Sequence, residues 1–226
     1  MWPTQAAALT AYQRDLAAAA PPTWRPAGDH LRVGGCWVCF PRGLTGPGSA
    51  GDPAWGAAVV MLGRTVVDRR VTTGRTAAAY HPGLLALRIG PLLERATGAL
   101  ATPPDVLLVD ATSRDHPRRA GLALHLGAEL DLPTVGITHR PLLAEGAWPE
   151  DRRGATSPLR VAGTVVGCWL RVRAGVRPLV VHPGWRVDLA TAVEVVMTST
   201  SRRRRTPEPL RRARQLARRA RAAAAA

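Results

Sequence analysis

A short apolar run in the middle of the chain most constrains the fold. Residues 105–110 read Asp-Val-Leu-Leu-Val-Asp, four apolar side chains with an acid at each end. Such a run predicts a central strand that is buried on both faces. A carboxylate at the carboxyl end of such a strand lies where open α/β sheets bind ligands, so Asp110 is a candidate functional residue. The alternative is that Asp110 only caps the following loop or helix.

The segments around this strand alternate between strand and helix patterns. Apolar runs and turn residues, with Gly63 and Arg64 as a two-residue hairpin turn, predict further strands at residues 31–40, 55–62, 65–72, 133–138, 161–172 and 178–181. Helical spacing and capping signals predict helices at residues 1–20, 82–96, 117–130, 188–198 and 210–226. Strands first, then alternating helices and strands, predict an α/β fold with a mixed sheet flanked by helices.

Length and apolar content limit the class of protein. The 226 residues suit one domain with appendages: an N-terminal helix and linker (1–29), a central domain (30–200) and a basic C-terminal tail (201–226). No apolar run approaches the roughly 20 residues that span a bilayer. The N-terminus also lacks the pattern of a secretory signal. We expect a monomer that does not bind membranes.

The cysteines point to a reducing environment. There are only 3 of them, an odd number, which argues against a disulfide scaffold and favours a cytoplasmic protein. Cys36 and Cys39 form a C-x-x-C pattern. On a strand, however, side chains three residues apart point to opposite faces, so buried cysteines are favoured over a metal or redox pair.

The chain is strongly basic, and all of its basic charge is arginine. It carries 31 arginines, no lysine and a net charge of +15. Residues 201–226 hold ten of the arginines and one acid, Glu208, so this segment carries +9 and the remainder +6. A basic excess favours phosphate-bearing partners, here nucleic acid. One side of the expected last helix could follow a phosphate backbone, and a solvated tail is the equal alternative; that side holds Arg211, Arg214, Arg218 and Arg221.

A series of short motifs in one order resembles a known family. They lie at residues 80–88, 105–110, 116–119, 131–136, 166–167, 183–184 and 207–209. Together they resemble the endonuclease V family over roughly residues 30–215. The resemblance implies a ribonuclease H-like fold. It also implies recognition of deaminated bases, chiefly inosine or deoxyinosine, and cleavage on the 3′ side with Mg²⁺ or Mn²⁺.

The resemblance assigns roles to individual residues. It implies that Asp110 is a metal-binding carboxylate, that His116 lies near the active site, and that Tyr80 belongs to a strand-separating wedge beside the lesion. Unstacking a base costs a few kcal/mol, and an aromatic face can replace the lost stacking. The alternative for Tyr80 is an ordinary half-buried loop tyrosine. Further expected nucleic-acid contacts are Pro82, Gly83, Arg118 and Gly184.

The departures from the family pattern fall on the chemistry. Trp37 stands where the family's first strand carries a metal-binding aspartate, and Ile89 stands at the position of a metal-site glutamate. His139 aligns with a family lysine, and Trp185 with a family histidine. Metal-assisted hydrolysis needs carboxylates to concentrate cations and orient a water. Efficient two-metal cleavage is therefore not expected, although Asp110 and substrate phosphates could hold one Mg²⁺ weakly.

Three functions are compatible with these patterns. The leading one is binding of deaminated-base DNA or RNA with phosphodiester cleavage lost or weak. The second is an active inosine endonuclease that uses Mg²⁺ or Mn²⁺, or a softer site for Mn²⁺ or Zn²⁺ rebuilt around Asp110. The third is a general nucleic-acid or partner-binding protein without catalysis. The residues that could rebuild a metal site with Asp110 are Asp115, His116, His139 and His182.

Overall fold

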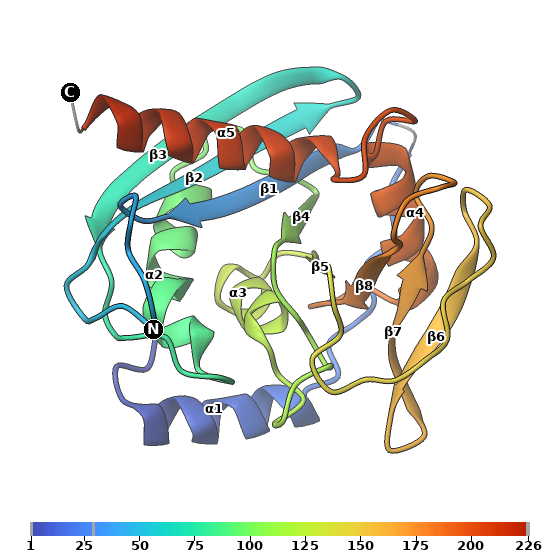
Figure 1. The fold of residues 1–226 in the computed structure, drawn as a ribbon, viewed down its shortest axis with the longest axis horizontal. Coiled ribbons are helices and arrows are strands. Elements are labelled where there is room, and N and C mark those ends of the chain that lie inside the picture. The colour runs from blue at the N-terminus through green and yellow to red at the C-terminus, as the bar shows by residue number, and fades with distance from the viewer. Residues whose placement is uncertain (1, 29, 225–226) are drawn as a thin grey trace.

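The expected central strand lies in the middle of an eight-stranded mixed sheet in the computed structural model of the chain (Figure 1). The structure describes residues 2–28 and 30–224. The strands are β1 (Arg32–Cys39), β2 (Pro53–Leu62), β3 (Thr65–Arg75), β4 (Val106–Val109), β5 (Thr134–Thr138), β6 (Thr156–Val161), β7 (Thr164–Leu170) and β8 (Leu179–Pro183). Their order is β3-β2-β1-β4-β5-β8-β7-β6. Strand β4 is buried at all four positions and runs parallel to β1 and β5, whereas the other pairs are antiparallel.

Helices cover both faces of this sheet, as the α/β class predicts. The helices are α1 (Ala6–Ala18), α2 (Leu85–Gly98), α3 (Leu122–Leu130), α4 (Leu189–Ser199) and α5 (Glu208–Ala223). Side chains of α2 and α3 form one core cluster with β1, β2 and β4, and side chains of α4 and α5 form another on the opposite face. Helix α1 packs outside α3. Met1, Asp29, Ala225 and Ala226 lie outside the described residues. Helix α1 begins at Ala6 and ends at Ala18, and α5 begins at Glu208 and ends at Ala223, so the predicted bounds 1–20 and 210–226 were wrong.

Other element boundaries also differ from the sequence expectation, most clearly at β6 and α3. The strand expected at 161–172 is the second half of a hairpin, which turns at Ala162 and Gly163, both with positive φ. Its first half, β6, has one buried residue and contains Pro158, so it lacks the strand pattern, as edge strands can. Helix α3 begins later than residue 117, because residues 111–121 form a loop before the helix.

The basic C-terminal segment forms part of the packed fold. Helix α5, red in Figure 1, crosses β1 and β2 and buries Leu210, Ala213 and Ala217 against them. Close approach is possible because Gly35 in β1 has no side chain: a Cβ there would lie 2.4 Å from the carbonyl carbon of Pro209. The apolar face of α5 is narrow and is surrounded by arginines, so the sequence pattern does not indicate that this helix packs on the sheet. Six of the ten arginines of this segment are therefore on a packed helix rather than on a solvated tail, and the other four, at 202–205, precede it.

Candidate functional site

Asp110 and Trp37 lie side by side at the carboxyl ends of two parallel strands. The pairing of β1 with β4 ends at Cys36 and Val109, and the next residue on each strand is Trp37 and Asp110. Aligned residues of neighbouring strands point to the same face, which here is the face covered by α5. Although the Asp110 carboxylate reaches solvent, desolvation by the surrounding protein raises its pKa to about 6, and the cation of Arg214 acts in the opposite direction.

The indole of Trp37 is fixed next to Asp110 by α5. It is half-buried and packs against Ala213, Leu216 and Ala217. The guanidinium carbon of Arg214 lies 5.4 Å from the centroid of the Trp37 ring, a cation–π distance. An apolar ring and a fixed cation therefore occupy the surroundings of the carboxylate.

Ile89 lies on the other face of the sheet. It belongs to α2 and packs against the core cluster that contains Cys36. Because Cys36 and Trp37 are consecutive strand residues, they point to opposite faces. Ile89 and the Trp37 indole therefore pack against different core clusters. Cys39 lies in the cluster under α5, so the two cysteines of the C-x-x-C pattern are buried on opposite faces, and both are free thiols.

The donor set does not fit a two-metal site. Within residues 2–28 and 30–224, no group of three or more His, Cys, Asp and Glu side chains is placed to hold a metal ion. Asp115 is buried and accepts hydrogen bonds from the backbone N–H groups of Leu142, Leu143 and Ala144, so its oxygens are engaged in holding that loop. Buried His182 hydrogen-bonds Thr138 at 3.1 Å. The alternative site around Asp110 is therefore not assembled.

Arg214 lies close to Asp110, and two arginines that the sequence did not single out lie near His139. Arg214 faces Trp37 and Asp110, and Arg205 and Arg177 lie near His139 at the end of β5. Burial, followed by the cations of Arg205, Arg214 and Arg177, lowers the pKa of His139. The sequence showed Arg214 only as one of four arginines on a helix side, and nothing in it indicated that Arg177 and Arg205 would lie together.

The loop at residues 80–83, which carries the expected wedge residue Tyr80 and is called the wedge loop, is held by a compact polar network. The carbonyl of Gly83 accepts hydrogen bonds from Arg118 Nη2 at 2.7 Å and from Gln13 Nε2 at 3.2 Å, and it also contacts His116 Nε2 at 3.2 Å. Arg118 Nε in turn donates to Gln13 Oε1 at 2.5 Å. The Tyr80 side chain stays 44% exposed at the start of this loop. The structure thus brings together Gly83, His116 and Arg118, with Tyr80 and Pro82 on the same loop.

His116 contacts the wedge loop through the carbonyl of Gly83. No hydrogen bond or ion pair joins His116 to Asp110 among the residues that the structure describes. Burial, reinforced by the cation of Arg118, lowers the pKa of His116 to about 4. The imidazole is therefore neutral near pH 7. Its Nδ1 accepts a hydrogen bond from the Arg118 backbone N–H, and its Nε2 contacts the Gly83 carbonyl.

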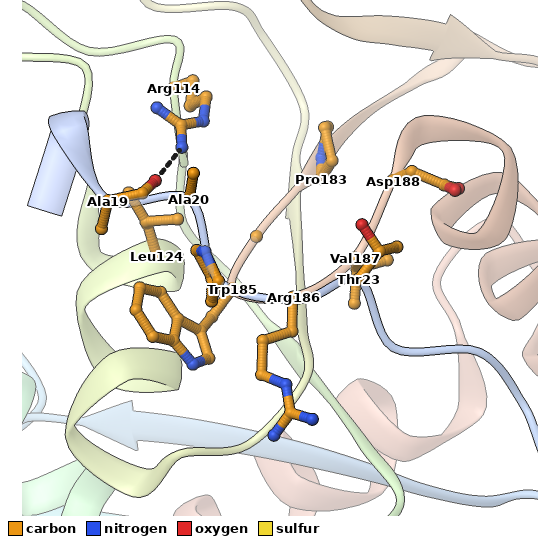
Figure 2. A pocket seen from close by; sticks show the side chains of 12 residues that line it. Ala19, Ala20, Thr23, Arg114, Leu124, Pro183, Trp185, Arg186, Val187 and Asp188 are labelled. Carbon is orange, nitrogen blue, oxygen red and sulfur yellow. Dashed lines mark hydrogen bonds between the residues drawn. The ribbon is translucent and has the colours of Figure 1, made fainter.

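Gly184 and Trp185 lie at the opposite end of the sheet from Asp110. Strand β8 runs antiparallel to β5, and Trp185 exchanges hydrogen bonds with Thr134 at the amino end of β5. Asp110, by contrast, follows the carboxyl end of β4. Gly184 and Trp185 line a pocket of about 230 Å³, where Figure 2 shows Arg114 donating to the carbonyl of Ala19. Neither residue therefore joins the group around Asp110.

Comparisons with known proteins agree on one family. A family model described as Endonuclease V matches residues 44–215. The Endonuclease V of Methanopyrus kandleri is 44% identical over 171 residues, which cover 75% of this chain and 73% of that protein. The crystal structure of the Endonuclease V from Streptomyces avermitilis matches with a TM-score of 0.86 and 34% identity, covering 100% of this chain and 96% of that one.

A structure with bound nucleic acid shares the fold. Ciona intestinalis Endonuclease V in complex with a 24mer DNA containing an inosine followed by a ribo-adenosine matches with a TM-score of 0.73 and 22% identity, covering 95% of this chain and 96% of that one. Within the described residues of the present chain, no helix combines the length and apolar composition needed to cross a bilayer.

Proposed function

The chain belongs to the endonuclease V family, and we propose that it binds DNA or RNA containing deaminated, inosine-type bases while phosphodiester cleavage is lost or weak. The observation that carries this proposal is the placement of Trp37 beside Asp110 under α5. Mg²⁺ requires oxygen ligands in near-octahedral geometry, and an indole supplies none. A lone carboxylate next to a guanidinium is a poor site for concentrating divalent cations.

The wedge loop supports retained binding. Its Gly83 carbonyl is held from three directions, so the exposed ring of Tyr80 is presented from a fixed backbone. Unstacking a base costs a few kcal/mol, and stacking on an aromatic ring offsets part of that cost. The inosine-containing DNA on the Ciona intestinalis protein of the same fold supports this choice of ligand.

Residual cleavage is the second candidate, and the exposure of Asp110 favours it. An exposed carboxylate can share one Mg²⁺ or Mn²⁺ with substrate phosphates. Either ion is the cofactor that we expect for any remaining activity. The 3 buried free cysteines further support a reducing, cytoplasmic location, and we propose that the protein acts as a monomer.

A paired binding and cleavage assay tests the proposal. Strands with and without a single inosine are incubated with Mg²⁺ or Mn²⁺, and both bound fraction and product are measured. We expect preferential binding of the inosine strand and little or no product. Turnover at an ordinary nuclease rate that Asp110→Ala abolishes would instead establish an active endonuclease. Equal affinity for both strands, with a steep salt dependence, would indicate a general nucleic-acid binder.

A further inference from the structure

We propose that Arg214, with Arg177, Arg205 and His139, forms a phosphate-binding site beside Asp110 that holds a nucleic-acid strand without a divalent metal ion. We call these four residues the arginine site. The inference rests on the proposed function and names the group that would hold the strand. The positive charge that contacts the strand phosphate is then an arginine side chain rather than a bound metal ion.

The strand pairing places three of these residues at one end of the sheet. His139 follows β5 directly, and its neighbour Thr138 pairs with Val180 near the start of β8. Arg177 precedes β8 by two residues. Arg205 is tied to the same place, because its Nε donates to the carbonyl of Arg177 at 2.7 Å and its Nη2 to that of Pro178 at 2.9 Å.

Helix α5 brings the fourth residue to the same place. It begins three residues after Arg205, and its packing on β1 directs Arg214 toward the ring of Trp37. The guanidinium of Arg214 contacts the ring of Trp37, and its charge acts on both Asp110 and His139, which follow the adjacent strands β4 and β5. Arg177 lies over the ring of Trp148 at 5.6 Å, and this ring is 54% exposed.

Arg177, Arg205 and Arg214 have no acidic partner, a property that they share with other arginines of the described chain such as Arg118 and Arg153. On the same helix, Arg211 and Arg212 approach Glu208 at 2.6 and 3.8 Å. In contrast, neither Arg177, Arg205 nor Arg214 forms an ion pair within the described part of the chain. The guanidinium of Arg214 also makes no hydrogen bond to any described residue, so its five N–H donors remain available.

A backbone phosphate is the ligand that this arrangement fits. Guanidinium groups match phosphate oxygens in a fork-like geometry and form charge-assisted hydrogen bonds with them. Burial and the neighbouring Arg177 cation lower the pKa of Arg205, so positive charges are gathered there without compensation. An anion relieves this repulsion, whereas a divalent cation adds to it. Strand binding should therefore persist when metal ions are removed.

Fluorescence anisotropy with a labelled inosine-containing strand tests the site. The affinity of the unmodified protein should be equal in EDTA and in Mg²⁺ at matched ionic strength. Arg214→Gln should weaken binding by about tenfold or more, the usual scale for a charge-assisted hydrogen bond. Arg219→Gln is the matched control: Arg219 lies on the same helix, but it lines a shallow groove with Arg69 and Val66 of β3. Arg219→Gln should cost roughly twofold or less, whereas Arg214→Gln should also lower the salt slope by about 1, as the loss of a phosphate contact does.

The outcomes separate this inference from the proposed function. Binding that requires Mg²⁺, equal losses in the two variants, or no binding at all would overturn the arginine site. Arg214→Lys, which keeps the charge, should recover part of the affinity, and thermal unfolding of each variant shows whether α5 remains packed. If inosine and undamaged strands bind equally, the proposed function fails, yet the contrast between Arg214→Gln and Arg219→Gln still tests the site on either strand.

Discussion

The wedge loop and the surroundings of Asp110 are built in opposite ways. In the wedge loop, the Gly83 carbonyl is surrounded by Gln13, His116 and Arg118, and a polar network fixes the backbone. Around Asp110, an indole and a guanidinium stand close by, and the carboxylate makes no hydrogen bond to a described residue. The two regions also use different faces of the sheet. The aromatic ring expected to stack on a displaced base and the charged groups around Asp110 therefore lie on separate parts of the fold, so one set can change while the other is kept.

Lowering the pH should produce the largest change in the free energy of unfolding, and the buried histidines and Asp110 respond to acid with opposite signs. Burial lowers the pKa of His116 in the wedge region to about 4, and also that of His125 and His182. Unfolded histidines titrate near pH 6.5, so the unfolded state binds more protons between pH 6.5 and 4. The stability that these groups contribute above pH 6.5 is lost as the pH falls through that window. At up to about 1.4 kcal/mol per pH unit for each group, the loss amounts to several kcal/mol.

Asp110 titrates with the opposite sign. Its pKa is raised to about 6 in the folded protein, so its contribution to stability is present at low pH and is lost as the pH rises through 6. This carboxylate is exposed, so solvent weakens its effect and the histidines dominate. Urea unfolding from about pH 7.5 to about pH 5 measures the balance. A free energy of unfolding that stays level or rises toward pH 5 would contradict the expectation.

Gly35→Ala should destabilise the packing of α5 on β1, next to Asp110, and leave the wedge loop unchanged. A Cβ at this position would lie 2.4 Å from the carbonyl carbon of Pro209 and 2.6 Å from the backbone nitrogen of Leu210. Backbone atoms cannot give way cheaply, so α5 must lift from β1 at a cost of about 3 kcal/mol. Urea unfolding measures this loss. Gly28→Ala is the control, because a Cβ there meets nothing within 4 Å, and equal stability of the two variants would disprove the close contact.

Much of the fold could be predicted from local patterns, and what was missed depended on packing. The apolar run of β4 and the N-cap of α4, where Asp188 accepts from the Thr191 backbone N–H at 2.8 Å, are visible in the sequence. Strand β6 was missed because an edge strand with one buried residue and an internal proline shows no alternation. The packing of α5 was missed because its buried residues, Pro209, Leu210, Ala213 and Ala217, are few and mostly small and stand between arginines.

The candidate site divides in the same way. The adjacency of Trp37 and Asp110 follows from strand order, and motif matching identified both residues. The arginine site draws on residues from 139 to 214, which only the pairing of β5 with β8 and the docking of α5 bring together. Trp185 was grouped with Asp110 by alignment, but the antiparallel direction of β8 carries it to the other end of the sheet. Strand direction cannot be read from a local pattern.

Gly83→Ala tests the wedge loop at a smaller scale. Gly83 has a φ of 75°, and a Cβ would lie 2.9 Å from Arg118 Nη2. Left-handed backbone costs a residue with a side chain about 1–2 kcal/mol, and the side chain of Arg118 must also move. Gly43→Ala is the matched control, since Gly43 has a φ of 81° with open space around it. Both variants should lose a similar free energy of unfolding in urea, but only Gly83→Ala should bind the inosine strand more weakly. Equal affinity of the two variants would show that the polar network around Gly83 does not contribute to recognition.

Tyr80→Ala should have the smallest effect, and it asks whether the wedge loop recognises the lesion at all. Because 44% of the side chain is exposed, the free energy of unfolding should change by less than about 0.5 kcal/mol. Loss of one stacked base costs about 1 kcal/mol or more, roughly a fivefold weaker affinity for the inosine strand. Tyr80→Phe keeps the ring and should bind nearly as well as the unmodified protein. Both variants are titrated with strands that contain or lack inosine, and the affinities are compared. A ring that replaces lost stacking should add most affinity on the strand in which a base is displaced. An equal loss of affinity for both strands would show that Tyr80 contacts nucleic acid without recognising the lesion. The wedge loop and the surroundings of Asp110 would then differ only in how firmly the backbone is held.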